Sequence, residues 1–249
     1  MSIEYAALSD CGKTRVLNED SFLVGNEDKP KIFILADGMG GHNAGEIASK
    51  MMADTAMDFL RENSDDASEG IRSYGRLLAA SIAHANTVLF SAQAEKAELC
   101  GMGTTSDICA VWDEEFCVAH VGDSRVYILK GEKIKQITKD HSVVEMMVDN
   151  GTITQQEAKT HPQRNIITRA VGTSERIKTD ISHQKWSEGD VIIMCSDGLT
   201  NMLSDAAIAD IVRSAPTLGE AAANLVREAN SAGGFDNITV ILIKRQVRG

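Results

Sequence analysis

The chain has few of the features that would mark a disordered, disulfide-bonded, exported or membrane-bound protein. Only 3 of its 249 residues are proline, which argues against long disordered linkers. Its 5 cysteines form no C-x-x-C pair and are odd in number, so free thiols in a reducing compartment are expected. No apolar run is long enough to cross a bilayer, and the first residues lack the basic and apolar regions of a secretory signal. The sequence therefore predicts a soluble cytoplasmic protein with no membrane association.

Positive charge is also in short supply. The chain carries 25 Lys and Arg against 36 Asp and Glu, a formal net charge of -11. An acidic chain gains nothing from counterion release on DNA or RNA, so no nucleic-acid partner is expected. Excess carboxylates suit divalent cations, which prefer oxygen ligands, although many proteins are acidic only for solubility.

The apolar residues, 43% of the chain, are enough for a sizeable core. There is no internal repeat and no domain boundary, so one catalytic domain over residues 1–249 is expected. Strands and helices do not strictly alternate, which favours packed antiparallel sheets with helices outside over a doubly wound parallel sheet. Apolar periodicity predicts strands at 31–36, 108–113, 115–123, 125–131, 133–138, 190–195 and 238–247, and helices at 44–62, around 78–89, at 205–213 and at 218–230. The four strands from 108 to 138 are separated by short turns and predict an antiparallel meander.

Four aspartates stand where a predicted strand meets a turn: Asp37, Asp123, Asp197 and Asp236. Each has glycine nearby, and glycine allows a backbone carbonyl or a metal to approach closely. Any one Asp-Gly by itself is more often a simple turn. Together, at one edge of a sandwich, such carboxylates would form a pocket that only divalent cations make tolerable, because bare carboxylates repel one another.

Eight stretches, in order across nearly the whole chain, resemble the metal-dependent protein phosphatases, the type 2C serine/threonine phosphatases, in their compact bacterial form. They are SDCGKTRVLNEDS (9–21), ADGMGGHNAGEIAS (36–49), MGTTSD (102–107), VGDSRVY (121–127), TKDHSVV (138–144), RNIITRAVG (164–172), CSDGLTN (195–201) and FDNITV (235–240). The resemblance implies an α+β fold, a four-layer α-β-β-α sandwich in which two antiparallel β-sheets are flanked by helices. The metals would lie at one end, between the sheets.

The resemblance also implies a chemistry, the hydrolysis of phosphoserine and phosphothreonine by a hydroxide that bridges two metal ions. Asp37 would bridge both ions, the carbonyl of Gly38 would bind one of them, and Asp197 and Asp236 would complete the other. Two cations about 4 Å apart can share a hydroxide and lower its pKa toward neutrality. An all-oxygen ligand set favours manganese or magnesium over zinc, which prefers nitrogen and sulfur.

Further roles follow from the same resemblance. Glu19 and Asp20 match an acidic pair that acts mainly through bound water. Arg15 matches a phosphate-binding arginine, whose guanidinium fork suits a phosphoryl group, although an isolated arginine is usually a surface residue. Asp123 matches a ligand of a third, weaker cation shared with Asp197, with a turn residue as the alternative.

The proton donor is less clearly marked. Many eukaryotic relatives have a histidine directly after the first Asp-Gly, where this chain has Met39. His42 is the candidate substitute as general acid, and a metal-bound water is the alternative. The segment 140–169 matches the bacterial flap beside the site, and His141 and His161 within it are expected to be polar loop residues.

The expected partners are phosphoproteins, including a serine/threonine kinase and its substrates, and the chain is expected to be a monomer. Three other functions stay open: hydrolysis of small phosphoesters or phosphodiesters, a degenerate family member that only binds, and regulation of sigma-factor partners. The complete set of metal-ligand candidates argues against the degenerate member, and the lack of an attached sensor domain gives no support to the sigma-factor role.

Overall fold

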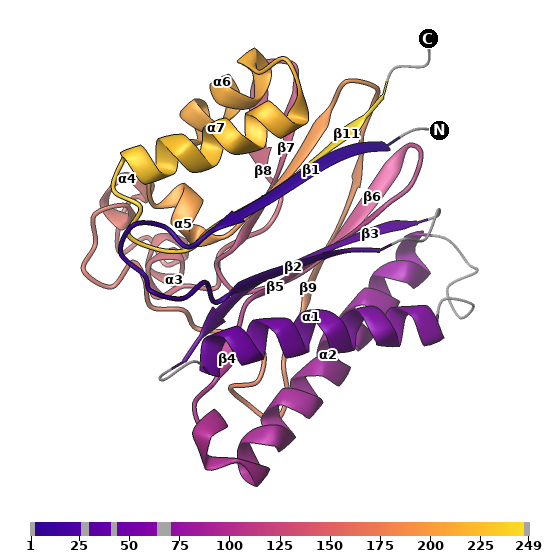
Figure 1. The fold of residues 1–249 in the computed structure, drawn as a ribbon, viewed down its shortest axis with the longest axis vertical. Helices are drawn as coiled ribbons and strands as arrows, with labels where there is room; N and C mark the ends of the chain where they lie inside the picture. Colours follow the sequence, from indigo (N-terminus) through magenta and orange to yellow (C-terminus); the bar gives the residue numbers. More distant parts are fainter. Residues whose placement is uncertain (1–2, 26–29, 41–43, 64–70, 247–249) are drawn as a thin grey trace.

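Two antiparallel β-sheets stack face to face, with helices on both outer faces (Figure 1). The computed structural model describes residues 3–25, 30–40, 44–63 and 71–246. The first sheet has the order β1 (Ile3–Asp10), β11 (Ile238–Arg245), β10 (Val191–Cys195), β7 (Arg125–Lys130) and β8 (Lys133–Gln136). The second has the order β2 (Asp20–Val24), β3 (Lys31–Met39), β5 (Ser106–Val111), β6 (Glu115–Val121) and β9 (Asp180–Lys185), with β4 (Gly103–Thr104) paired to β3.

The helices complete the predicted four layers. The long helices α1 (Ala44–Glu62) and α2 (Ile71–Glu95) cover the second sheet, and α6 (Asp205–Ser214) and α7 (Leu218–Ser231) cover the first (Figure 1). Short helices, α3 (Val143–Asp149), α4 (Gln155–Ala158) and α5 (Asp197–Thr200), lie together at one end of the sandwich (Figure 1). The 3-10 turn η2 (Ala97–Leu99) follows α2. The α-β-β-α fold class predicted from the sequence is confirmed.

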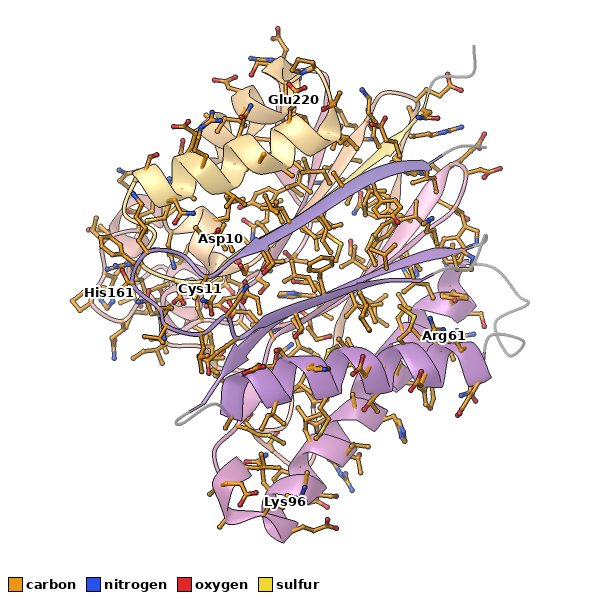
Figure 2. The ribbon with its side chains drawn as sticks, in the orientation of Figure 1. Asp10, Cys11, Arg61, Lys96, His161 and Glu220 are labelled. Atoms are coloured by element: carbon orange, nitrogen blue, oxygen red, sulfur yellow. The ribbon has the colours of Figure 1, made fainter. Side chains whose placement is uncertain are left out.

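The period-2 pattern of the strands explains the layers. In β3, Phe33 and Leu35 point into the core between the sheets, whereas Ile32, Ile34 and Ala36 pack beneath α1 and α2. Because both faces of this strand are buried, it is apolar at successive positions instead of alternating with polar residues. Figure 2 shows side chains filling the space between the sheets and beneath the helices.

The predicted four-stranded meander is wrong. Strands β5 and β6 form a hairpin in the second sheet, and β7 and β8 form one in the first, so the chain crosses between sheets at Gly122–Ser124. The free edge of β6 is taken by β9, and that of β7 by β10. Strand β9 is polar and largely exposed, so its sequence carries no apolar strand signal.

Two of the predicted Asp-Gly turns are also different in the structure. Strand β3 continues through Asp37 and Gly38 to Met39, and Asp197 is the first residue of α5. Asp236 lies in the connection between α7 and β11, as predicted. In the parts of the chain that the structure describes, no helix is long and apolar enough to cross a membrane.

Candidate active site

Asp37 is held in a fixed position by its own strand and by two threonines. In the pairing of β2 with β3, Asp37 lies directly opposite Asp20. Its backbone N–H donates to Thr105 Oγ1 at 2.9 Å, and its carbonyl accepts from the Thr104 hydroxyl at 2.9 Å and from the Thr105 amide at 2.9 Å. Directly opposed residues on paired strands share a face, so the two carboxylates are neighbours.

Two glycines of the site are required by close backbone approach. A side chain at Gly38 would collide with the carbonyl oxygens of Gly45 and Glu19. A side chain at Gly198 would collide with the carbonyl oxygen of Asn237. The Asp-Gly pairs therefore bring β3 against the start of α1, and α5 against the segment that carries Asp236.

The carboxylates are placed where ionisation is costly. Burial, and then the charges of Asp20 and Asp197, hold the pKa of Asp37 well above its usual range. Burial, and then Asp236, raise the pKa of Asp197 to about 6. Burial also raises the pKa of Asp20, although hydroxyl donors partly oppose this shift. These side chains interact electrostatically, and added positive charge would stabilise their ionised forms.

The N-terminal loop brings Arg15 onto this cluster. Arg15 Nη2 donates to Asp236 Oδ2 at 2.8 Å, and the Asn237 amide donates to Asp236 Oδ1 at 2.9 Å. The side chain of Asn237 donates to the carbonyl of Leu17 and accepts from the amide of Glu19, both at 2.9 Å, so it ties the loop to the site. About half of the Arg15 side chain, 48%, is exposed, and its guanidinium can reach a ligand in solvent.

The Glu19 side chain lies at the start of α1, where the backbone of Gly45 hydrogen-bonds its carboxylate. Burial raises the pKa of Glu19, and the charge of Arg15 opposes this shift. A carboxylate at a helix N-terminus is favoured by the helix dipole.

Asp123 lies at the crossing between sheets, between β6 and β7. His141 hydrogen-bonds both backbone groups of Gly122, the residue before Asp123. The His141 amide donates to the carbonyl of Gly122 at 2.7 Å, and His141 Nδ1 accepts from the Gly122 amide at 3.0 Å. Burial, and then Asp197 and Asp140, raise the pKa of Asp123 to about 7. The segment is thus a sheet crossing with an acidic side chain near Asp197, and the hairpin-turn alternative is wrong.

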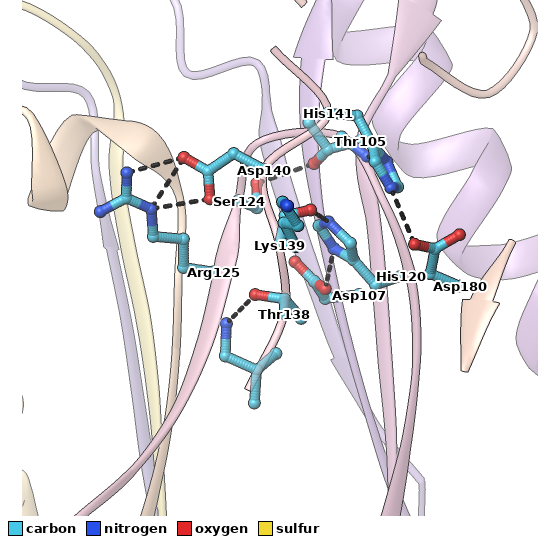
Figure 3. A network of polar contacts seen from close by, with 12 residues as sticks. Thr105, Asp107, His120, Ser124, Arg125, Thr138, Lys139, Asp140, His141 and Asp180 are labelled. Atoms are coloured by element: carbon cyan, nitrogen blue, oxygen red, sulfur yellow. Dashed lines mark hydrogen bonds and ion pairs between the residues drawn. The ribbon is translucent and has the colours of Figure 1, made fainter. Parts of the chain in front are cut away.

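Figure 3 shows the polar network beneath this crossing, with dashed lines joining Arg125 to Asp140 and His120 to Asp107. The guanidinium of Arg125 binds Asp140 through Nε and Nη2, with distances of 2.6 to 3.0 Å. His120 Nδ1 lies 2.7 Å from Asp107 Oδ1, and both side chains are buried. This network fixes both strands that flank Asp123.

His141 lies in a loop and makes polar contacts, as predicted, but it is not at the surface. Its ring is buried, with its centroid 4.6 Å from that of the His120 ring and the two ring planes tilted by 34°. Burial, and then the neighbouring His120 and Arg169, lower the pKa of His141 to about 4. A neutral ring is what allows Nδ1 to accept from the Gly122 amide. His161 is partly exposed, and its Nδ1 accepts from the amide of Gln163 at 3.2 Å, as befits a loop residue.

A pocket of about 810 Å³ opens beside Asp123 and Asp197. Its walls come from α3, α4 and α5 and from the segment that precedes α6. Lys159 and Arg164 contribute positive charge to this wall. The pocket is therefore open directly beside two of the carboxylates.

Residues 11–231 match the family model described as protein phosphatase 2C. The chain belongs to the protein phosphatase 2C family. It is 39% identical over 244 residues to protein phosphatase PhpP of Streptococcus pneumoniae, covering 97% of both chains. The solved serine/threonine phosphatase of S. agalactiae superposes with a TM-score of 0.91 at 35% identity, covering 98% of this chain and 100% of that one. A solved catalytic domain of the phosphatase PstP, in complex with 2 manganese ions, is 33% identical with a TM-score of 0.84, covering 98% of this chain and 99% of that one.

The family and the enzyme class predicted from the eight motifs are thereby confirmed: this 2C phosphatase is a phosphoprotein phosphatase whose relatives act on serine and threonine. Its fold is shared with the solved phosphatases.

This 2C phosphatase brings most of the predicted residues to one end of the sandwich. Electrostatic coupling links Arg15, Glu19, Asp20, Asp37, Asp123, Asp197 and Asp236. Among the described residues, however, no three His, Cys, Asp or Glu side chains converge tightly enough to enclose one ion. Gly38 is described within β3, whereas His42 lies outside the described residues.

Several residues of the site are not among the sequence predictions. They hold the predicted residues in place through hydroxyl and amide groups: Thr104, Thr105, Ser196, Asn237 and Thr239. All five lie inside motifs that carried the family resemblance, and two of them, Ser196 and Asn237, adjoin a predicted ligand in the sequence. Membership of a motif was therefore the signal available, but the direction of each hydrogen bond required the fold.

The donor set of the phosphatase fits manganese or magnesium. It consists of carboxylates and one backbone carbonyl, with no nitrogen or sulfur ligand among the predicted residues. The buried oxygen Oδ1 of Asp20 has no hydrogen-bond partner among the described residues. Buried polar atoms are rarely left without a partner, so a cation or its water shell is the fitting neighbour.

Proposed function

We propose that the chain hydrolyses phosphoserine and phosphothreonine in proteins, with manganese or magnesium held by the carboxylates around Asp37. The observation that carries the proposal is the opposition of Asp20 and Asp37 on paired strands, with both pKa values raised by burial and by neighbouring aspartates. Such a cluster is stable in its ionised form only beside cations. The manganese ions of the PstP domain support the same choice of metal.

Each residue has a distinct proposed role toward the cations. Asp37 would bridge two ions, the carbonyl of Gly38 would bind one, and Asp197 and Asp236 would bind the other. Glu19 and Asp20 would act mainly through bound water, in keeping with the lack of a tight three-ligand cluster among the described residues. When bound, the cations would lower the pKa of a water and polarise the phosphoryl oxygens.

Arg15 is proposed to hold the phosphoryl group. Its guanidinium lies against Asp236 and is half exposed, so it can turn to a phosphate at the cation site. Hydrogen bonds from a guanidinium fork orient the phosphoryl oxygens and stabilise the charge that develops on them.

The experiment that tests the function and this role together is turnover of a phosphothreonine peptide by the wild type and by Arg15→Ala. The wild type should release phosphate in manganese buffer, whereas Arg15→Ala should have a higher KM, a lower kcat and a loss of roughly 10²-fold in kcat/KM. Manganese stoichiometry, measured by calorimetry, should be unchanged. Lys13→Ala, an exposed change in the same loop, is the control and should behave as wild type.

No turnover of any phosphopeptide by wild-type protein would contradict the proposed function. Lost manganese with normal kinetics at saturating manganese would instead make Arg15 a structural residue. The same assay with a small phosphoester distinguishes protein substrates from the broader phosphoesterase alternative.

We further propose a third, weaker cation held by Asp123 and Asp197. The proximity of the two charges and the raised pKa of both carboxylates support it. Few protein ligands would face this cation, so it should bind more weakly than the core pair.

Asp123→Ala should therefore reduce the number of bound manganese ions by one in a calorimetric titration while the core pair and the fold are retained. Turnover should fall, and additional manganese should not fully restore it. Asp54→Ala, on the exposed face of α1, is the control. An unchanged cation count with an unchanged kcat would leave Asp123 a purely structural residue of the crossing.

The remaining proposals concern the whole chain. We propose one catalytic domain over residues 1–249. Within it, segment 140–169 would be a flap beside the pocket, and helices α3 and α4 of this segment form part of the pocket wall. The protein would act as a cytoplasmic monomer on phosphoproteins that include a serine/threonine kinase and its substrates. His42 is kept as the proposed proton donor. Phosphoserine and phosphothreonine signals that rise in cells lacking the chain would identify the substrates.

A further inference from the structure

Only one of the two carboxylate oxygens of Asp20 has hydrogen-bond partners among the described residues. Asp20 is the first residue of β2, is 9% exposed, and lies opposite Asp37 in the second sheet. Its Oδ2 accepts from the Thr239 hydroxyl at 2.6 Å and from the Ser196 hydroxyl at 2.8 Å. Its Oδ1 is buried and has no partner among the residues that the structure describes.

The two hydroxyls are themselves oriented by other donors. The Thr239 amide donates to Ser196 Oγ at 2.9 Å, which leaves the Ser196 proton for Asp20. The carbonyl of Asn237 is a more distant acceptor for Ser196, at 3.4 Å. Each hydroxyl has only one proton to donate. A hydroxyl that accepts a hydrogen bond from one neighbour must therefore direct its own proton to another.

A second chain of donors ends at Thr239. The side-chain Nδ2 of Asn18 donates to Ser9 Oγ at 2.7 Å, and Ser9 and Thr239 are joined by a 2.7 Å hydrogen bond. Because Thr239 gives its proton to Asp20, Ser9 must donate to Thr239. The hydrogen bonds therefore run in one direction, from Asn18 to the carboxylate.

The hydrogen bonds from Ser196 and Thr239 to Asp20, here called the clamp, also join the two sheets. Thr239 is in β11 and Ser196 follows β10, both in the first sheet, whereas Asp20 and Asp37 are in the second. Ser196 directly precedes Asp197. The same contact that orients Asp20 thus sets the separation between the ligand candidates of one sheet and those of the other.

We propose that Ser196 and Thr239 are positioning residues for the cation site: they hold one oxygen of Asp20 and direct the other to a cation or its bound water. The inference rests on the proposed cation-dependent function. Outer hydrogen-bond partners orient metal-binding carboxylates, and their loss typically costs about 10–100-fold in metal affinity. A tie that only stabilised the sandwich would lower stability without a specific effect on cation affinity.

A double-mutant cycle on manganese affinity, measured by calorimetry, separates these two roles. Thr239→Val keeps the shape of the side chain and removes the hydroxyl, Ser196→Ala removes the other, and Asp20→Asn removes the charge. We expect Thr239→Val and Ser196→Ala each to weaken manganese binding about 10–100-fold. Adding Thr239→Val to Asp20→Asn should give no further loss, because the hydroxyl acts through Asp20. Thr239→Ser, which retains the hydroxyl, should bind manganese nearly as tightly as wild type.

Ser81→Ala is the matched control, since Ser81 is also fully buried and its hydroxyl donates to the carbonyl of Leu78 at 2.7 Å, within α2. It should leave manganese affinity unchanged. If Asp20→Asn weakens binding but both hydroxyl variants bind as wild type, the clamp is refuted and the cation site stands. Additive losses in the double mutant also refute action through Asp20. If Asp20→Asn binds manganese as wild type does, Asp20 has no part in the cation site and both proposals fail at this residue.

Discussion

Removal of divalent cations should abolish phosphatase activity, and manganese should restore it. Protein treated with EDTA and passed through a desalting column is expected to release no phosphate from a phosphothreonine peptide above the background rate. The reason is that no described residue near the site replaces a cation-activated water: the thiol of Cys195 is fully buried, and burial raises its pKa. Without cations, the aspartates also repel the phosphoryl group that they should bind.

Readdition of manganese, and separately of magnesium, distinguishes loss of the cation from loss of the fold. Both should recover turnover, and circular dichroism of the chelated protein should show the same helix and strand content as the untreated protein. The control is EDTA saturated with manganese before it is added. Full activity in chelated protein would rule out the proposed mechanism, whatever the residues around Asp37 do.

The helices and strands with strong apolar periodicity were the predictable part of the fold. The predicted helix at 44–62 coincides with α1, and the predicted strand at 190–195 agrees with β10 to within one residue. Packing of their apolar faces is encoded locally, so a period of 3.6 or 2 is enough to find them. Strands β1, β2 and β9 are not among the predicted strands, and the predicted path through Gly122 is wrong, because pairing between distant strands leaves no local pattern.

The sequence was enough to predict which residue types would bind the cations, but not how those residues are arranged in space. The aspartates were found from strand ends and from the family resemblance. The contact of Arg15 with Asp236 joins residues 221 positions apart, and the bond from Thr239 to Asp20 joins residues 219 positions apart. Such contacts depend on how the two sheets stack, which residue order alone does not specify.

The burial of His141 is a further feature that could not be predicted from the sequence. A histidine in a polar loop is usually at least partly exposed, and nothing in the residues around His141 predicts its burial. In the fold it is buried against His120 and bonded to both backbone groups of Gly122. Its environment is made by strands from outside its own segment, so burial could not be inferred from its neighbours in sequence.

Asp37→Asn should have opposite effects on turnover and on stability. The side chain is proposed to bridge both cations, so turnover should fall by more than the roughly 100-fold that loss of an outer-shell partner can cost. Phosphate release from a phosphothreonine peptide at saturating manganese measures this effect. Asp58→Asn is the control, because the Asp58 side chain is 70% exposed on α1 and is not among the proposed ligands.

In EDTA the same variant should be more stable than the wild type near neutral pH. Burial, and then Asp20 and Asp197, raise the pKa of Asp37, so the folded state binds a proton that the unfolded state releases. The wild type therefore loses stability as the pH rises from the unfolded pKa through the folded one, and asparagine, which does not ionise, avoids this loss. An increase of a few °C in Tm would be a measurable gain, since 1 kcal/mol corresponds to roughly 2–4 °C in a chain of this size.

The difference in Tm between Asp37→Asn and wild type should shrink as the pH is lowered to about 3, below the ordinary aspartate pKa of about 3.9, where the wild-type carboxylate is largely protonated in both states. Saturating manganese should reverse its sign, because only the wild type gains the full binding free energy of the cations. A variant with wild-type turnover would show that Asp37 is not a bridging ligand. A variant that is less stable in EDTA at every pH would show that the Asp37 carboxylate is stabilised by its surroundings, and that repulsion among the aspartates does not govern the site.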